Sequence, residues 1–244
     1  MFLSTLQLES NRDLRVANQE LAHLTLDGFL TWALSTFGEE MAQVTSFGPA
    51  GIVVLDHLAR LHPGMRVITI DTNFLFPETY RLWEEIERRY AITLEVRRAE
   101  TTPAMQTEFY GPRLWELEPD VCCHVRKVTP LADALTGLRA WIAGLRRDQS
   151  AARTGTMLVD WDHRHGLYKL NPLAMWPKAR VWHYLRTHDL PYNKLHDQGY
   201  ASVGCTHCTR PAVDGDERAG RWQGQVKSEC GLHLGTRPWG SCPE

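Results

Sequence analysis

Four of the six cysteines in this sequence form two close pairs. Cys122 and Cys123 are adjacent, whereas Cys205 and Cys208 form a Cys-x-x-Cys pair. Four thiolates in two pairs suit either a tetrahedral zinc ion or an iron–sulfur cluster. A zinc ribbon typically uses two Cys-x-x-Cys pairs that lie close in sequence. These pairs lie far apart and one has no spacer, so the pattern favours a cluster that the folded chain assembles.

Arg126 and Lys127 follow the first cysteine pair. Positive side chains beside a thiolate-bound cluster can offset its negative charge. A solvated basic pair explains the same two residues equally well. The cysteines also have a simpler explanation, in which Cys122 and Cys123 are buried thiols and the Cys-x-x-Cys pair is an unrelated redox motif.

Cys230 has no spacing partner among these four cysteines. It lies near the C-terminus in segment 229–233, whose sequence is Glu-Cys-Gly-Leu-His. Next to a glycine and polar residues we expect an accessible thiol, whose thiolate His233 could stabilise if the turn is helical. Lys227 adds positive charge. A spare surface thiol is the alternative, and we expect Cys242, two residues from the end, to be a thiol in a mobile tail.

Two loops have the composition of an anion site. Segment 45–51, Thr-Ser-Phe-Gly-Pro-Ala-Gly, leads from an expected strand into an expected helix, where free N–H groups suit a phosphate or sulfate. It is not a Walker loop, and a plain turn is the alternative. Segment 71–73, Asp-Thr-Asn, follows the next expected strand, where Asp71 could instead cap a helix. Ligands bind beyond the carboxyl ends of parallel strands, so both loops would face one nucleotide pocket.

Arginines cluster in the second half of the chain. Segment 146–150 reads Arg-Arg-Asp-Gln-Ser, and Arg210, Arg218 and Arg221 follow the second cysteine pair. Guanidinium groups offer fork-shaped donors to phosphate or sulfate, although solvent exposure explains each arginine equally well. The histidines of segment 161–166 are expected in a polar hairpin tip rather than in a metal site.

The elements that must position these residues alternate between helix and strand. Helices are expected over 11–38, 49–61, 77–90, 130–136 and 177–188, and strands over 41–45, 66–70, 92–96, 140–143 and 156–159. Such alternation predicts an α/β fold with a mostly parallel, doubly wound sheet and helices on both faces. After residue 190 the pattern thins, and we expect a loop-rich C-terminal segment.

The length of 244 residues suits one α/β domain. Within it we expect an N-terminal helical segment 1–38, a nucleotide-binding region 39–200 and a C-terminal segment 201–244. The net charge of −2 gives no general attraction to nucleic acid or membrane. No apolar run approaches the roughly 18–20 residues of a membrane span, and residues 1–10 do not resemble a secretory signal, so a cytoplasmic location is expected.

Taken together, the motifs resemble those of the assimilatory sulfonucleotide reductases, specifically the cluster-containing adenosine 5′-phosphosulfate (APS) reductases. The resemblance runs from about Val44 to His233. It is carried by Ser46-Phe47-Gly48, segment 71–80, Cys122-Cys123 with Arg126-Lys127, segment 144–150, Pro191-Tyr192-Asn193, segment 204–210 and segment 229–233. Asn73 stands where similar proteins often have glycine, and asparagine tolerates a left-handed backbone nearly as well.

The resemblance implies an adenine-nucleotide-hydrolase-like (PP-loop type) fold and thioredoxin-dependent reduction of APS to sulfite and AMP, in sulfate assimilation and cysteine biosynthesis. It implies a [4Fe–4S] cluster on Cys122, Cys123, Cys205 and Cys208. It makes Cys230 the nucleophile that becomes an S-sulfonate, with thioredoxin or glutaredoxin as electron donor. The expected substrate-binding residues are Ser46, Phe47, Gly48, Asp71, Thr72, Lys127, Arg146, Arg147, Gln149, Arg218, Arg221 and His233. A homo-oligomer is possible.

Three alternatives stay open. A reductase of the 3′-phosphorylated substrate (PAPS), or one that accepts both, is the nearest, although such relatives generally lack the two cysteine pairs. An ATP pyrophosphatase shares the fold, but its loop is expected to read Ser-Gly-Gly-x-Asp-Ser, unlike segment 46–51. A non-catalytic metal scaffold would have no use for Cys230.

Overall fold

The computed structural model describes residues 11–212 and 216–233, with side chains from residue 14 onward. Cys242 and residues 1–10 lie outside the described residues. That Cys242 is a thiol in a mobile C-terminal tail therefore stays a prediction. In the described part of the chain, no helix is both long and apolar enough to cross a membrane.

One six-stranded sheet forms the centre of the molecule, in the order β3-β2-β1-β4-β6-β5. Its strands are β1 (Met41–Val44), β2 (Val67–Asp71), β3 (Glu95–Arg98), β4 (Ala140–Ile142), β5 (Val159–Asp162) and β6 (Leu167–Leu170). All neighbours pair in parallel except β5 and β6. The mostly parallel, doubly wound α/β fold predicted from the sequence is confirmed.

The outer strands of the sheet differ from the strands expected from the sequence. The strand expected at 156–159 begins only at Val159, and the one expected at 92–96 is displaced to Glu95–Arg98. Strand β6 was missed, because its sequence Leu-Tyr-Lys-Leu carries a charge although Lys169 is buried. The prediction of a polar hairpin tip over 161–166 is confirmed. Strands β5 and β6 are antiparallel, and Gly166, with a φ of 68°, ends the turn between them.

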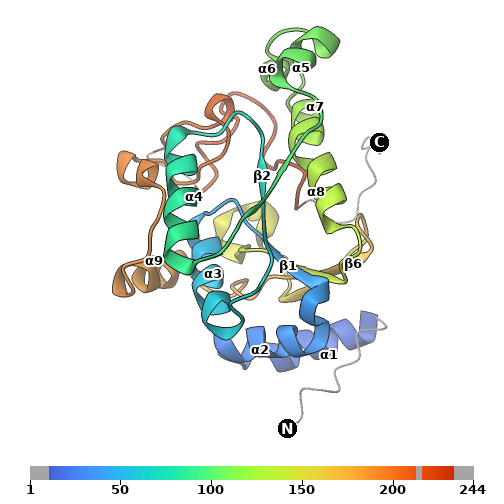
Figure 1. Ribbon diagram of the computed structural model, residues 1–244, viewed down its shortest axis with the longest axis vertical. Helices are drawn as coiled ribbons and strands as arrows, with labels where there is room; N and C mark the ends of the chain where they lie inside the picture. The colour runs from blue at the N-terminus through green and yellow to red at the C-terminus, as the bar shows by residue number, and fades with distance from the viewer. Residues whose placement is uncertain (1–10, 213–215, 234–244) are drawn as a thin grey trace.

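Helices cover both faces of the sheet (Figure 1). One face packs against α2 (Leu26–Phe37), α3 (Pro49–Leu61), α4 (Pro77–Tyr90) and α9 (Lys178–Thr187), which share the largest apolar core with α1 (Asn11–Leu21). On the other face α8 (Thr129–Leu135) packs its Ala134 against Ala42 and Ile68. Because alternate residues of a strand point to opposite faces, β1 and β2 contribute to both cores.

The expected N-terminal helix is in fact two helices. Thr25 interrupts the run 11–38, and its side chain accepts a hydrogen bond from Gly28 N at the start of α2. A threonine that caps the next helix competes with continuation of the first one. Although segment 11–38 forms two helices, its apolar side chains still pack in the core.

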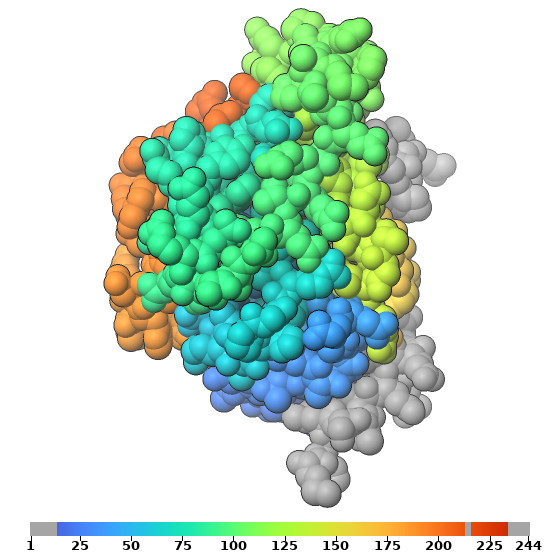
Figure 2. Space-filling model, viewed as in Figure 1, coloured from blue at the N-terminus to red at the C-terminus, as the bar shows by residue number. Residues whose placement is uncertain are grey.

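Three short helices lead from the sheet to the first cysteine pair. They are α5 (Pro103–Tyr110), α6 (Leu114–Leu117) and α7 (Pro119–Cys123), and a π-helical turn (His124–Val128) joins α7 to α8. The part that contains α5 and α6 projects beyond the rest of the molecule (Figures 1 and 2). The two adjacent cysteines thus lie where this projection meets the body, at the end of a helix rather than in a flexible loop.

Candidate active site

The loop between β1 and α3 forms the first part of the site. Thr45 Oγ1 accepts a hydrogen bond from Phe47 N at 2.9 Å, and Phe47 has a φ of 56°. Helix α3 starts after Gly48 with Pro49 in its first turn, and no side chain caps it. The first N–H groups of this 13-residue helix therefore have no side-chain partner and are available to an anion.

Two glycines bring the loops after β1 and β4 to the same edge of the sheet. A Cβ on Gly144 would lie 2.7 Å from Gly51 N, and a Cβ on Gly51 would lie 2.4 Å from Thr45 Oγ1. Any side chain at these positions would push the two loops apart. The close contact places the start of α3 beside the segment that begins at Leu145.

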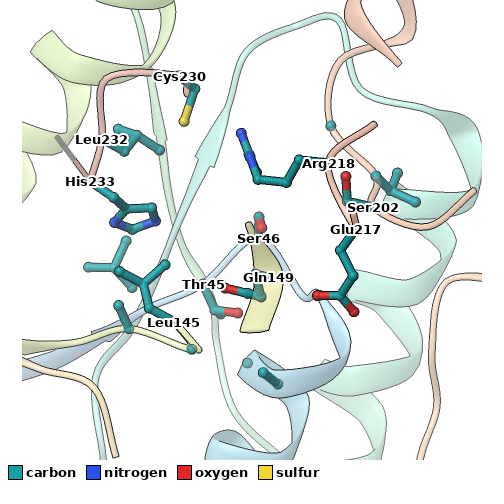
Figure 3. A pocket seen from close by; sticks show the side chains of 18 of the residues that line it. Thr45, Ser46, Leu145, Gln149, Ser202, Glu217, Arg218, Cys230, Leu232 and His233 are labelled. Carbon is teal, nitrogen blue, oxygen red and sulfur yellow. The ribbon is translucent and has the colours of Figure 1, made fainter. Parts of the chain in front are cut away.

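A cavity of about 200 Å³ lies beyond the carboxyl ends of the central parallel strands. Figure 3 shows the Cys230 sulfur and the Arg218 guanidinium pointing into the same space above Ser46. The structure brings nine of the expected substrate-binding residues to its wall: Ser46, Gly48, Thr72, Lys127, Arg146, Gln149, Arg218, Arg221 and His233. A nucleophile, a helix start and several cations therefore share one cavity.

Three expected substrate-binding residues are not among the residues that line this cavity. Phe47 is buried in the core against Trp83. Arg147 donates its Nε to Thr156 O at 2.8 Å. Asp71 accepts hydrogen bonds from Asn73 N, Tyr80 OH and Arg98 Nε at 2.8–2.9 Å. Asn73 has a φ of 61°, which agrees with its expected left-handed backbone, so Asp71 shapes this turn.

Cys230 is half-buried at the cavity wall. Burial alone would raise the pKa of its thiol, but the charges of Lys127 and Arg218, the Leu232 backbone N–H and the charge of Arg221 outweigh burial and lower this pKa. A cationic surrounding of this kind favours the thiolate, which is the nucleophilic form of cysteine. The sequence predicted an accessible thiol, and the structure shows that the thiol of Cys230 is accessible from the side of the cavity.

Three of the cations that act on Cys230 lie close to the ring of Trp222. Its ring is buried, and Lys127 Nζ, Arg218 Cζ and Arg221 Cζ lie 6.0, 5.4 and 4.5 Å from the ring centroid. The face of an aromatic ring attracts cations, so Trp222 allows positive charges to lie close together. Arg210, in contrast, is exposed and donates to backbone carbonyls outside the cavity.

The expected role of His233 beside the thiolate is wrong. Residues 231–233 form no helical turn, and the His233 ring stacks on Trp141 with centroids 5.7 Å apart. Burial, together with the charges of Lys169, Arg153 and Arg218, lowers the pKa of His233 well below its usual value. The imidazole is therefore neutral near pH 7 and supplies no positive charge to Cys230.

Arg146 lines the cavity but already has acidic partners. It is buried, and its Nε and Nη2 donate to Asp148 at 2.9 Å and Glu217 at 2.7 Å. Arg221 is placed differently, since a Cβ on Gly204 would lie 2.3 Å from its Nη2. The Arg221 guanidinium thus passes directly over a glycine next to Cys205, and it has no carboxylate partner among the described residues.

All four paired cysteines line a second, smaller cavity together with Lys127, Arg126 and the aromatic rings of Phe74, Trp115 and His207. Thr72 Oγ1 lies 3.3 Å from Cys205 Sγ, and Lys127 Nζ lies 3.9 Å from Cys123 Sγ. Burial and the neighbouring cysteines raise the pKa of Cys122 to about 12, and burial and Cys205 raise that of Cys208 to about 11. Without a bound cation the thiols of Cys122 and Cys208 stay protonated at pH 7.

Two buried cations accompany these thiols. Arg126 and Lys127 are 1% and 7% exposed, and within the described residues neither has a carboxylate partner. Arg126 also keeps one buried nitrogen, Nη2, without a hydrogen bond. A group with net negative charge bound by four thiolates would compensate both cations, so these residues fit an iron–sulfur cluster. In the described chain, no three His, Cys, Asp or Glu side chains already form a site for a single metal ion.

Sequence reasoning missed the contacts that hold Cys230 in place. Glu229, next to it, forms a buried ion pair with Arg153, and Arg164 donates to Gly231 O at 2.6 Å. Glu217 was also missed, although it lines the cavity. These partners lie 67 to 76 residues apart in the sequence, so no local spacing could have indicated them.

Comparisons of this chain with a family model and with individual known proteins agree on one family. Residues 40–211 match the sequence model of a protein family that is described as the phosphoadenosine phosphosulfate reductase domain. An adenosine 5′-phosphosulfate reductase of Halalkalibacterium halodurans is 45% identical over 88% of this chain and 94% of its own. A phosphoadenosine 5′-phosphosulfate reductase of Gloeobacter violaceus is 44% identical over 86% of this chain and 89% of its own.

A solved structure agrees with this result. The phosphoadenylyl-sulfate (PAPS) reductase of Candida auris, crystallised as a phosphate complex, superposes with a TM-score of 0.74 at 31% identity. The match covers 82% of this chain and 98% of that one. The similarity thus extends over most of this chain and nearly all of that one.

Proposed function

This chain belongs to the phosphoadenosine phosphosulfate reductase domain family, and we propose that it reduces APS to sulfite and AMP with electrons from a dithiol protein. One observation carries the proposal. The Cys230 thiol, with its lowered pKa, faces the cavity that also contains the start of α3 and the Arg218 guanidinium. A nucleophile opposite an anion site is the arrangement that sulfonyl transfer from a phosphosulfate requires.

The first step forms an S-sulfonate on Cys230. The thiolate attacks the sulfur of APS, an S–S bond forms and the bond between sulfur and the phosphate oxygen breaks. AMP leaves with the bonding electron pair on its phosphate. The α3 N–H groups would hold this phosphate, while Lys127, Arg218 and Arg221 stabilise charge on the sulfonyl oxygens. Neutral His233 can donate one hydrogen bond but adds no charge.

The second step consumes two electrons from a dithiol. A thiolate of thioredoxin or glutaredoxin attacks the Cys230 sulfur and displaces sulfite, which leaves a mixed disulfide. The second thiol of the donor then attacks this disulfide and releases the Cys230 thiolate, so that the donor is oxidised. Such a donor works in a reducing compartment, which fits the cytoplasm.

We propose a [4Fe–4S] cluster on Cys122, Cys123, Cys205 and Cys208. When bound, it supplies a fixed negative charge close to the substrate cavity and keeps four thiols deprotonated. Lys127 lines both cavities and can compensate part of this charge while it faces the substrate. Arg126, with its unpaired Nη2, would compensate another part.

APS is favoured over PAPS by the cations of the cavity. Arg146 and Arg153 line it but are ion-paired with Glu217 and Glu229. A 3′-phosphate would need an additional cation, and a nearby Glu217 carboxylate would repel it. PAPS reduction, or acceptance of both substrates, is the second candidate, because the Gloeobacter violaceus relative carries the PAPS reductase name.

The decisive experiment compares the initial rates of sulfite release from APS and PAPS. The protein is prepared without oxygen and supplied with reduced thioredoxin. We expect a rate at least about tenfold higher with APS, which corresponds to about 1.4 kcal/mol of transition-state preference. Equal rates would make this a reductase for both substrates. No sulfite from either substrate, with the cluster intact, would refute the reductase proposal.

A further inference from the structure

The carboxylate next to the nucleophile is held by a buried arginine. Arg153 Nε and Nη2 donate to the two oxygens of Glu229 at 2.8 and 2.9 Å. The side chains are only 9% and 6% exposed. Two parallel hydrogen bonds between charged groups fix both position and orientation. The ion pair therefore determines where residue 229, and with it residue 230, lies.

Side-chain contacts, and not regular secondary structure, hold this part of the chain, among them the ion pair of Lys227 with Asp120 and the stacking of His233 on Trp141. Residues 222–233, all of which the structure describes, form no helix or strand. Arg218 Nε donates to Ser228 O at 3.0 Å, and Arg164 Nη1 donates to Gly231 O at 2.6 Å. Arg218 also places its Nη2 3.2 Å from Glu229 Oε2, but only Arg153 forms two hydrogen bonds with this carboxylate, which is inserted into the body. Cys230 thus lies between contacts with arginines that come from distant parts of the sequence.

Arg153 also reaches the wall of the substrate cavity. Its Nη1 donates to Gln149 Oε1 at 2.6 Å, and the same oxygen accepts a hydrogen bond from Arg146 N at 3.0 Å. Gln149 lines the cavity below Cys230 (Figure 3). The nitrogens of Arg153 are thus committed to Glu229 and Gln149. This leaves Arg153 with a role in positioning rather than in direct binding of the sulfonate.

We propose that Arg153 is a positioning residue, whose contact with Glu229 holds Cys230 over the substrate during sulfonyl transfer and must break before the S-sulfonate is reduced. This inference rests on the proposed function. With Glu229 bound, the half-buried Cys230 sulfur faces the substrate cavity, which is not the direction from which a protein thiolate would approach. Release of Glu229 would free the segment, and reduction would then follow the same S–S exchange described above.

The proposal predicts opposite effects on the two half-reactions. Glu229→Gln removes the charge but keeps the shape, so it should loosen the segment. We expect formation of the S-sulfonate from APS, in a single turnover without reductant, to slow at least tenfold. We expect reduction of a preformed S-sulfonate by thioredoxin to become about two- to fivefold faster. A merely structural residue would slow both steps, and that result would overturn the proposal, as would no change in either step.

A matched control exists elsewhere in the fold. Glu95, at the start of β3, forms a similar two-bond contact with Arg66, at 2.7 and 3.0 Å. Glu95→Gln should leave both half-reactions unchanged.

A second readout does not depend on APS. A bulky maleimide should label Cys230 several times faster in Glu229→Gln than in the wild type, with the label located by fragmentation of the tryptic peptide that begins at Ser228. A Cys242→Ser background leaves Cys230 as the only cysteine of that peptide. Unchanged labelling would overturn the positioning role even if APS is not the substrate. If the wild type forms no S-sulfonate but the labelling difference appears, only the proposed function fails.

Discussion

Lys127 Nζ lies 3.9 Å from Cys123 Sγ, and the same side chain lines the cavity into which Cys230 points. Lys127 is therefore the cation between the paired cysteines and the nucleophile. Burial opposes its charge, but Cys205, Cys123 and Cys230 more than compensate and raise the pKa of Lys127. The amine stays protonated, which connects the charge of the cysteine site to the reactivity of Cys230.

Lys127→Met should weaken the nucleophile. Loss of this cation raises the pKa of Cys230 toward that of an ordinary thiol, so less thiolate is present at pH 7. We expect the midpoint of the pH profile for alkylation of Cys230 to move upward by about one unit, and S-sulfonate formation at pH 7 to fall about tenfold. Lys178→Met, at an exposed position, is the control. An unchanged profile would show that the remaining groups, Arg218, Arg221 and the Leu232 backbone N–H, are sufficient to lower the pKa of this thiol.

Cys230→Ser should abolish the first half-reaction and little else. A hydroxyl has nearly the shape of a thiol but is a far weaker nucleophile at neutral pH. We expect AMP to bind within about twofold of the wild-type affinity and the cluster content to stay unchanged, because the four paired cysteines are untouched. Mass spectrometry should detect no sulfonate adduct after incubation with APS. An adduct on this variant would rule out Cys230 as the nucleophile.

The sequence predicted two helices of the first half to the residue because their signals are local. Helices α3 and α4 begin and end at the expected residues, since each has a proline in its first turn and a continuous apolar face. The cysteine pairs were likewise visible from spacing. The Glu229–Arg153 contact joins residues that are 76 positions apart, and no local pattern predicts it. The error at His233 has the same origin, because its neutral state follows from burial by distant residues.

Cys205→Ser should remove the cofactor that we propose. Cys205 is buried beside Thr72 and lines both cavities, so its loss leaves three thiolates for a group that needs four. We expect loss of most of the iron and acid-labile sulfide, measured chemically and by visible absorbance, and a lower melting temperature. Cys242→Ser should retain both. Zinc without sulfide in the wild-type protein would instead support the tetrahedral zinc alternative.

Lys169 should make the stability of the protein depend on pH in the alkaline range. Burial, only partly offset by Asp162, lowers the pKa of this amine to about 8 in the folded protein, whereas the unfolded chain keeps a value of about 10.4. Between these pH values the unfolded chain binds more protons, so the free energy of unfolding rises with pH, by up to about 3 kcal/mol.

Urea unfolding at pH 7.5, 9 and 10.5 measures this rise at equal cofactor content. Lys169→Met should be more stable than the wild type at pH 7.5, and the difference should shrink as the pH increases. Other groups also titrate in this range, and therefore the difference between the two proteins is the relevant quantity. A difference that is constant with pH would mean that Lys169 is not charged and buried at pH 7.5.

Gly204→Ala should disturb the substrate cavity through Arg221. The new Cβ would lie 2.3 to 2.8 Å from the guanidinium atoms of Arg221, which is the flexible end of a side chain and can move away. The fold should therefore survive while the cation leaves its place above Trp222. Since Arg221 also helps to lower the pKa of Cys230, both substrate binding and thiolate formation should suffer.

Steady-state kinetics with APS should show a KM increased about tenfold and a reduced kcat, with unchanged iron content. Gly64→Ala is the control, because a Cβ there has no neighbour within 4 Å. If Gly204→Ala instead loses iron but keeps its KM, the glycine serves the adjacent Cys205 rather than Arg221. An unchanged KM and an unchanged pH profile, with iron retained, would show that Arg221 is not needed above Gly204 for binding or for activation of Cys230.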